Sequence, residues 1–228
     1  MRKKLLIIFS LFISYQVMAQ TPQELVNKIR IKLEKVNDYT AKGKLKTNVV
    51  FIKAPIASVK VYYKKPDKMK IVNENGISFI PKGSVNINLA KSLSAAGNYE
   101  IVDAGKEPAT GLRILKLLPT DENSDIVLST LYIDEKAELI KKAKNTTRDN
   151  GTYELEMSYG KYATYGLPDK VIFSFNTKDY KLPKGVTFDY DDGSEKKPGD
   201  NLKNKKGKVE ITYSEYLINK GVDDAVFK

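Results

Sequence analysis

The side chains that most often perform catalysis are missing from this sequence. Its 228 residues contain no histidine and no cysteine, which removes the usual general base, the thiol nucleophile and the preferred transition-metal ligands. Glu154 and Glu156 lie two residues apart, but they alternate with apolar residues on a predicted strand and therefore belong to its solvated face. Because histidine is absent, a serine nucleophile would need a lysine as its base instead. The composition therefore favours a protein that is not an enzyme.

One acidic stretch has part of the pattern of a calcium site. DYDDGSEKKPGD places Asp189, Asp191 and Asp200 at positions 1, 3 and 12 of an EF-hand loop. The fifth position, normally a ligand, holds Gly193, and the obligatory glycine after it is replaced by Ser194. Two lysines within the stretch would also repel a cation. These mismatches favour an ordinary Asp-Gly turn, and we expect no functional metal and no cofactor.

The segment GTYELEMSYGKY, residues 151–162, offers surface rather than reactive groups. Tyr153, Leu155, Met157 and Tyr159 alternate with polar residues, and successive side chains of a strand point to opposite faces. The segment is therefore predicted to be a strand with one apolar side. A second sheet, helices or a molecule that is not protein could cover that side.

One amphipathic helix is predicted near the start of the chain. Thr21-Pro22-Gln23-Glu24 is a capping box with proline at the first helical position. Its apolar stripe consists of Leu25, Val26, Ile29, Leu33 and Val36. A second, short helix is predicted within residues 84–97, where the strand pattern is lost.

Most of the remaining chain predicts strands. Alternating or apolar segments between turn residues mark 39–52, 58–64, 69–71, 77–79, 99–103, 112–118, 126–133, 139–147, 152–159, 171–175, 186–190 and 209–217. Consecutive antiparallel pairing would join them into one large sheet, and a sheet of that size must curl. Its apolar side exceeds what the first helix can cover. It therefore either folds onto itself as a packed sandwich or remains a half-open barrel that holds a ligand.

The first 19 residues are predicted to be a secretory signal peptide. MRKK is basic, LLIIFSLFI is an apolar run too short to span a bilayer, and Val17-Met18-Ala19 fits a cleavage site. We expect cleavage after Ala19, which leaves a single domain over residues 20–228. That exported domain has no disulfide, so burial of apolar surface must hold it together.

The net charge is positive but widely spread. It falls from +11 to +8 when Arg2, Lys3 and Lys4 leave with the signal peptide. Many of the other lysines alternate along predicted strands, as on the solvated face of a sheet. No RNA-recognition motif accompanies them, so we expect no nucleic-acid partner.

Four stretches, taken in order, carry a family resemblance. They are the N-terminal helix running into DYTAKGKLK; the hairpin YYKKPDKMKI; ILKLLP followed by LYIDEKAELIKKAKNTTRDNGTYELEMSYGKY; and the closing GKVEITYSEYLINKGVDDAVFK. In order and spacing they resemble the outer-membrane lipoprotein carrier (LolA-like) family, with its LolB-like and periplasmic sensor relatives. The resemblance covers nearly all of residues 21–228.

The resemblance implies a fold, a location and partners. The fold would be mainly β with a few helices (α+β): an incomplete antiparallel β-barrel, or half-barrel, covered by the N-terminal helix and a short lid helix. The protein would be a periplasmic monomer that shields lipoprotein acyl chains or another lipid in an apolar cavity during transfer towards the outer membrane. An inner-membrane lipoprotein-releasing transporter and an outer-membrane acceptor would be its partners.

The predicted lining of that cavity consists of inward-facing strand residues. They are Leu45, Val49, Phe51, Val59, Val61, Tyr63, Met69, Leu155, Met157, Tyr159, Val171 and Phe173. The same alternation would also arise in a fully packed core. In an open cavity Leu155→Ala should cost little stability, whereas in a packed core it should cost about 2 to 5 kcal/mol; we expect the former.

Two departures from the family bear on function. Where typical carriers place an arginine that hydrogen-bonds the lid, this chain has Lys65, Lys68 and Lys70, with Met69 at the aromatic position, and lysine lacks the guanidinium fork. The insertion around KLPKGVTFDYDDGSEKKPGD indicates a divergent branch. An alternative function is therefore a sensor or interaction module of the envelope that binds lipid or lipoprotein on the same fold without transporting it.

Overall fold

The computed structural model describes residues 20–48, 56–66, 68–74, 99–122, 124–149, 151–176 and 206–228. Within them lie helix α1 (Pro22–Glu34), two 3-10 turns, η1 (Ala163–Tyr165) and η2 (Asp224–Phe227), and ten strands. The strands are β1 (Asp38–Asn48), β2 (Ala57–Lys64), β3 (Lys68–Asn73), β4 (Tyr99–Lys106), β5 (Arg113–Pro119), β6 (Ile126–Asp134), β7 (Leu139–Thr147), β8 (Gly151–Ser158), β9 (Lys170–Asn176) and β10 (Lys206–Ile218). The predicted signal peptide, the strands at 77–79 and 186–190, the helix within 84–97 and the acidic stretch at 189–200 lie outside the described residues.

Helix α1 begins as the sequence predicts. The Thr21 hydroxyl accepts a 3.2 Å hydrogen bond from the main-chain N–H of Glu24, and the Glu24 carboxylate accepts one of 3.0 Å from the N–H of Thr21. This reciprocal pair satisfies two N–H groups that a helix start otherwise leaves unpaired. Leu25, Val26 and Ile29 are buried along the inner side of the helix.

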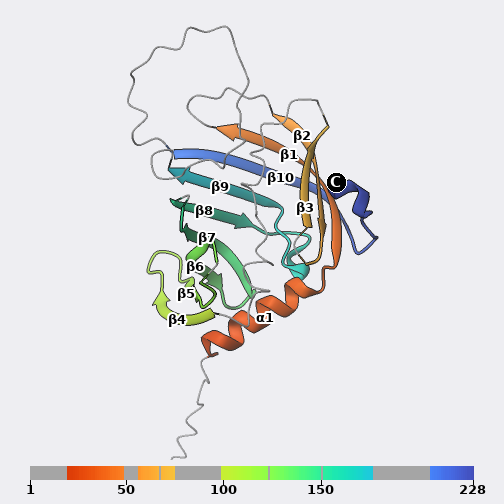
Figure 1. The fold of residues 1–228 in the computed structure, drawn as a ribbon. Helices are drawn as coiled ribbons and strands as arrows, with labels where there is room; N and C mark the ends of the chain where they lie inside the picture. Colours follow the sequence, from red (N-terminus) through yellow and green to blue (C-terminus); the bar gives the residue numbers. More distant parts are fainter. Residues whose placement is uncertain are drawn as a thin grey trace, which may run out of the picture.

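All ten strands form one antiparallel sheet in the order β3-β2-β1-β10-β9-β8-β7-β6-β5-β4. Most neighbours are consecutive, as predicted, but β1 pairs with the last strand, β10, with Leu45 opposite Ile211. Strands β3 and β4 are consequently the two edges, although they are successive among the described strands. The sheet curls into an open half-barrel (Figure 1), so the predicted half-barrel is confirmed and the two-sheet sandwich is not formed.

The two faces of the sheet differ as the sequence predicts. Along β1, Ala41, Leu45 and Thr47 are buried whereas Lys42 and Lys44 are exposed. The buried side chains belong to the concave face, and the lysines belong to the convex face. The same alternation continues through β2, with Val59, Val61 and Tyr63 buried.

A β-bulge interrupts the pairing of β1 with β10. The register of the pair shifts between Lys42 and Gly43, and a Cβ atom at Gly43 would lie 2.7 Å from the main-chain oxygen of Thr212. Only glycine fits this approach without a movement of the backbone. Gly43 therefore permits the pairing that joins the first and last strands.

Helix α1 spans one end of the half-barrel (Figure 1). It contacts β4 and η1, Lys32 donates a 2.6 Å hydrogen bond from Nζ to the main-chain oxygen of Ala137 between β6 and β7, and Lys65, after β2, donates one of 2.6 Å to that of Glu34. At roughly 20 Å, the helix can bridge the two edges of the sheet. We call this the α1 end; the far end is the opposite one, where β1 stops and β8 begins.

Candidate functional site

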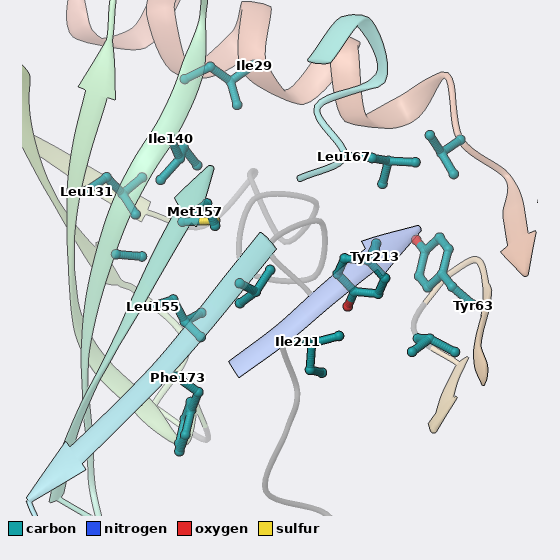
Figure 2. Close-up of a cluster of buried hydrophobic side chains, with 14 of the residues drawn as sticks. Ile29, Tyr63, Leu131, Ile140, Leu155, Met157, Leu167, Phe173, Ile211 and Tyr213 are labelled. Carbon is teal, nitrogen blue, oxygen red and sulfur yellow. The ribbon is translucent and has the colours of Figure 1, made fainter. Parts of the chain in front are cut away.

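The candidate site is the concave face of the half-barrel. Its inward side chains lie in rows across the strands: Leu155 lies opposite Phe173 on β9 and opposite Ala143 on β7. Figure 2 shows side chains such as Leu131, Leu155 and Ile211 directed toward a common interior, with Ile29 of α1 above them. The face is therefore continuous and apolar across strands that are far apart in the sequence.

The structure brings most of the predicted lining together on this face. Eight of the predicted residues are buried members of one cluster: Leu45, Val59, Val61, Tyr63, Leu155, Met157, Val171 and Phe173. Met69 and Tyr159 are partly buried and pack against that cluster. Val49 and Phe51 lie outside the described residues.

Tyrosines form a second zone of the face, toward the α1 end. The ring of Tyr39 stacks on Tyr63 with centroids 5.2 Å apart and meets the edge of Tyr216 at 5.3 Å, and Tyr213 lies 5.0 Å from Tyr216. Burial raises the pKa of Tyr39, Tyr213 and Tyr216 above the usual range. These phenols stay neutral, so they supply apolar surface and hydrogen-bonding groups but no nucleophile.

The concave face is polar toward its far end. Ser129 on β6 donates a 2.7 Å hydrogen bond from Oγ to Oδ1 of Asn145 on β7, and both residues are 3% exposed. The Asn145 side chain also hydrogen-bonds the hydroxyl of Tyr153 on β8. Burial raises the pKa of the Tyr153 phenol, and this effect is larger than the opposite effect of the hydrogen bond. Thr47, on β1, is buried with no hydrogen-bond partner for its Oγ1. Sequence reasoning missed Ser129 and Asn145, whose signal is a polar residue at an inward position of an otherwise apolar strand.

Arg113 is the buried charged residue among those the structure describes. Its guanidinium donates to Asp103 from Nη2 at 2.8 Å and to Glu135 from Nη1 at 2.9 Å. The hydrogen bond from Arg113 holds the pKa of the Asp103 carboxyl below its usual value, and Lys106 together with Arg113 lowers that of Glu135. A further bond from Nη1 reaches the main-chain oxygen of Gln20 at 2.6 Å. The group therefore connects the β4 edge to the start of α1, and its charge is matched.

The lysines near the family's arginine position have partners of their own. Lys64 and Lys68 donate hydrogen bonds of 2.9 and 2.7 Å to the carboxylate of Asp224 in η2. Lys70 donates to the main-chain oxygen of Lys228 at 2.8 Å. These contacts hold the last described turn against β3.

Neither a metal-binding cluster nor a membrane-spanning helix occurs in the described ranges. No three or more Asp or Glu side chains gather there at a spacing that could hold an ion. No helix among these residues is both long and apolar enough to cross a bilayer.

Comparisons with known proteins identify the fold. No protein-family model and no curated protein matches the chain. A solved domain assigned to outer membrane lipoprotein sorting in Vibrio parahaemolyticus superposes with a TM-score of 0.56 at 10% identity, covering 90% of this chain and 95% of that one. A DUF1329 family protein from Desulfovibrio piger gives a TM-score of 0.52 at 12% identity, over the same shares of the two chains. A LolA superfamily protein from Nitrosomonas europaea gives 0.49 at 10% identity, covering 89% and 97%.

At these identities the likeness establishes the fold, and the fold assignment depends on the two structures whose TM-scores exceed 0.5. The match to the first of these spans nine-tenths of this chain, whose described residues form an open antiparallel sheet with α1 across one end. The chain has the LolA-like half-barrel fold, in common with a domain assigned to outer membrane lipoprotein sorting.

Proposed function

We propose that this protein is a periplasmic carrier that binds the acyl chains of a lipoprotein or another lipid within its half-barrel and releases them toward the outer membrane. The observation that supports this most is the concave face of the single open sheet. Buried apolar side chains from β1, β2 and β5 to β10 form one cluster there. The solved domain with the same fold is assigned by name to lipoprotein sorting.

The physical basis is the transfer of methylene groups between two apolar environments. Each methylene removed from water contributes about 0.8 kcal/mol, so one acyl chain against this face would be held firmly in water. A membrane offers the same chain a comparable gain, which makes loading and unloading reversible. Because β3 and β4 are not paired with one another, the two walls can move apart without breaking the hydrogen-bonded ladder.

Binding rather than catalysis suits the groups on this face. Among the residues that the structure describes, its buried polar members are neutral phenols, hydroxyls and one amide, and its buried arginine is paired with two carboxylates. None of these is poised as a nucleophile or a general base. We therefore propose that the protein is not an enzyme, and that its partners are lipid together with the membrane proteins that supply and accept it.

Native mass spectrometry of protein purified without delipidation tests the proposal directly. We expect bound species whose mass corresponds to an acylated lipid and which disappear when the protein is unfolded. Transfer of a fluorescent acyl lipid from donor to acceptor vesicles then distinguishes a carrier from a sensor. Protein that contains no lipid, and that also fails to bind an acyl probe, would contradict the proposal.

A further inference from the structure

The buried polar side chains of the concave face are unevenly distributed. Thr47, Ser129, Asn145 and Thr147 all lie toward the far end, while Met157, Ile140 and Leu167 lie toward the α1 end. The register places Asn145 opposite Ser129 on one side and opposite Tyr153 on the other. Apart from the tyrosine hydroxyls and the ion-paired Arg113, which lie toward the α1 end, the buried polar side chains of this face therefore gather at the far end.

Asn145 has hydrogen-bonding capacity beyond the contacts described above. Its Oδ1 accepts from Ser129, and its side chain also bonds the Tyr153 hydroxyl. Because the Nδ2 amino group carries two hydrogens, one N–H remains for another acceptor. The residue is only 3% exposed, so that donor points into the protein interior rather than into bulk water.

Thr47, on the opposite wall of the half-barrel, provides a second and independent observation. Its side chain is buried, and its Oγ1 has no hydrogen-bond partner. A buried hydroxyl that lacks a partner costs stability, so its presence needs an explanation. Thr47 lies in the row of Val209, Phe173, Leu155 and Ala143, one inward position from the row of Asn145. Four strand spacings of about 4.8 Å separate the two walls along the sheet, roughly 19 Å around the curve.

We propose that the far end of the concave face is a polar subsite that donates hydrogen bonds to the ester or amide carbonyls of an acylated amphiphile, whose hydrocarbon chains extend toward the α1 end. Asn145 and Thr47 are the donors, because a carbonyl oxygen only accepts. This inference rests on the proposed function and narrows the ligand to acyl chains joined through carbonyl groups. Two donors on opposite walls suit a ligand that carries more than one such group.

The test compares two probes that differ only in their two ester carbonyl groups, one for each proposed donor. They are 1,2-dioctanoyl-phosphatidylcholine and its 1,2-di-O-octyl ether analogue, titrated into the purified full chain. Thr47→Val and Asn145→Leu keep side-chain size and remove the donors. We expect each substitution to weaken binding of the ester probe by about three- to tenfold, the effect of one lost hydrogen bond, and to leave binding of the ether probe unchanged. Thr212→Val, on the exposed side of β10, is the matched control and should alter neither probe.

Thr47→Val also keeps the test valid if Asn145→Leu folds poorly. Because Oγ1 of Thr47 has no partner, valine should maintain or raise the melting temperature while ester binding falls. If the wild-type protein binds both probes equally and the variants weaken both or neither, the subsite is wrong and the carrier proposal stands. If the wild-type protein binds neither probe, both proposals fail.

Discussion

Arg113 on β5 donates a 2.6 Å hydrogen bond from Nη1 to the main-chain oxygen of Gln20, the residue that precedes the N-cap of α1. The same guanidinium holds Asp103 of β4 and Glu135 of the turn after β6. At its other end the helix is held through Lys65 and the oxygen of Glu34. Two cationic side chains thus fix α1 across the open edges of the half-barrel.

Replacement of Arg113 should loosen this helix. We expect Arg113→Ala to lower the free energy of unfolding by about 1 to 3 kcal/mol, because it removes several charge-assisted hydrogen bonds. The loss should stay below that of a fully buried pair, since the side chains of Asp103 and Glu135 remain 37% and 26% exposed and can hydrate. Urea denaturation gives the energy, and hydrogen exchange should increase in the first turn of α1.

Arg148→Ala is the matched control for that experiment. Arg148 also donates to a main-chain oxygen at 2.6 Å, that of Glu122, but the contact is exposed and does not involve α1. We expect a change within about 0.5 kcal/mol and unaltered exchange in the helix. Equal effects of the two substitutions would mean that Arg113 does not hold α1.

The Asp224 carboxylate provides a pH-dependent test of the contact between η2 and β3. Hydrogen bonds from Lys68 and Lys64 lower its pKa to about 2. Because the folded pKa lies below the unfolded one, this contact stabilises the fold at neutral pH, and the contribution is lost as pH falls from about 4 toward 2. NMR titration of Asp224 should show that Lys68→Ala raises its pKa. An unchanged value would show that Lys68 is not its partner in solution.

The sequence was sufficient to predict the start of α1 and the inward face of strands with clean alternation, such as β8 and β9. The capping box at Thr21 predicted α1, and alternation placed Leu155, Met157 and Phe173 on the concave face, where the structure has them. Both signals are local, because capping and pleating depend on residues a few positions apart.

Relationships between distant segments could not be predicted in this way. Three such relationships depend on register or on packing between separate segments of the chain. They are the pairing of β1 with β10, the contact of Arg113 with Gln20 and that of Ser129 with Asn145. Ser129 and Asn145 also interrupt the apolar pattern of β6 and β7, so alternation alone does not show which face of those strands points inward. Polar residues at inward positions obscure a periodic signal and can at the same time mark a binding group.

Gly43 allows a direct test of the β1–β10 pairing. A methyl group there would meet the main-chain oxygen of Thr212 at 2.7 Å, which the backbone must move to relieve. We expect Gly43→Ala to cost about 1 to 3 kcal/mol of unfolding free energy in urea denaturation. Lys44→Ala, at the neighbouring exposed position, should change stability by less than about 0.5 kcal/mol. If both variants are equally stable, the close approach of the two strands is not present in solution.

Leu155 tests whether the concave face is both core and binding surface. The sequence led us to expect an open cavity in which Leu155→Ala costs little, but the side chain is 2% exposed and lies between Phe173 and Ala143. Its truncation should therefore leave a void and cost about 2 to 5 kcal/mol in denaturation experiments. The same variant should weaken binding of an acyl-chain probe, because the ligand loses part of the surface that contacts it. Glu156→Lys, exposed on the convex face, should change neither quantity by more than about 0.5 kcal/mol. A large loss of stability with unchanged probe binding would show that this part of the face is core that lipid never contacts.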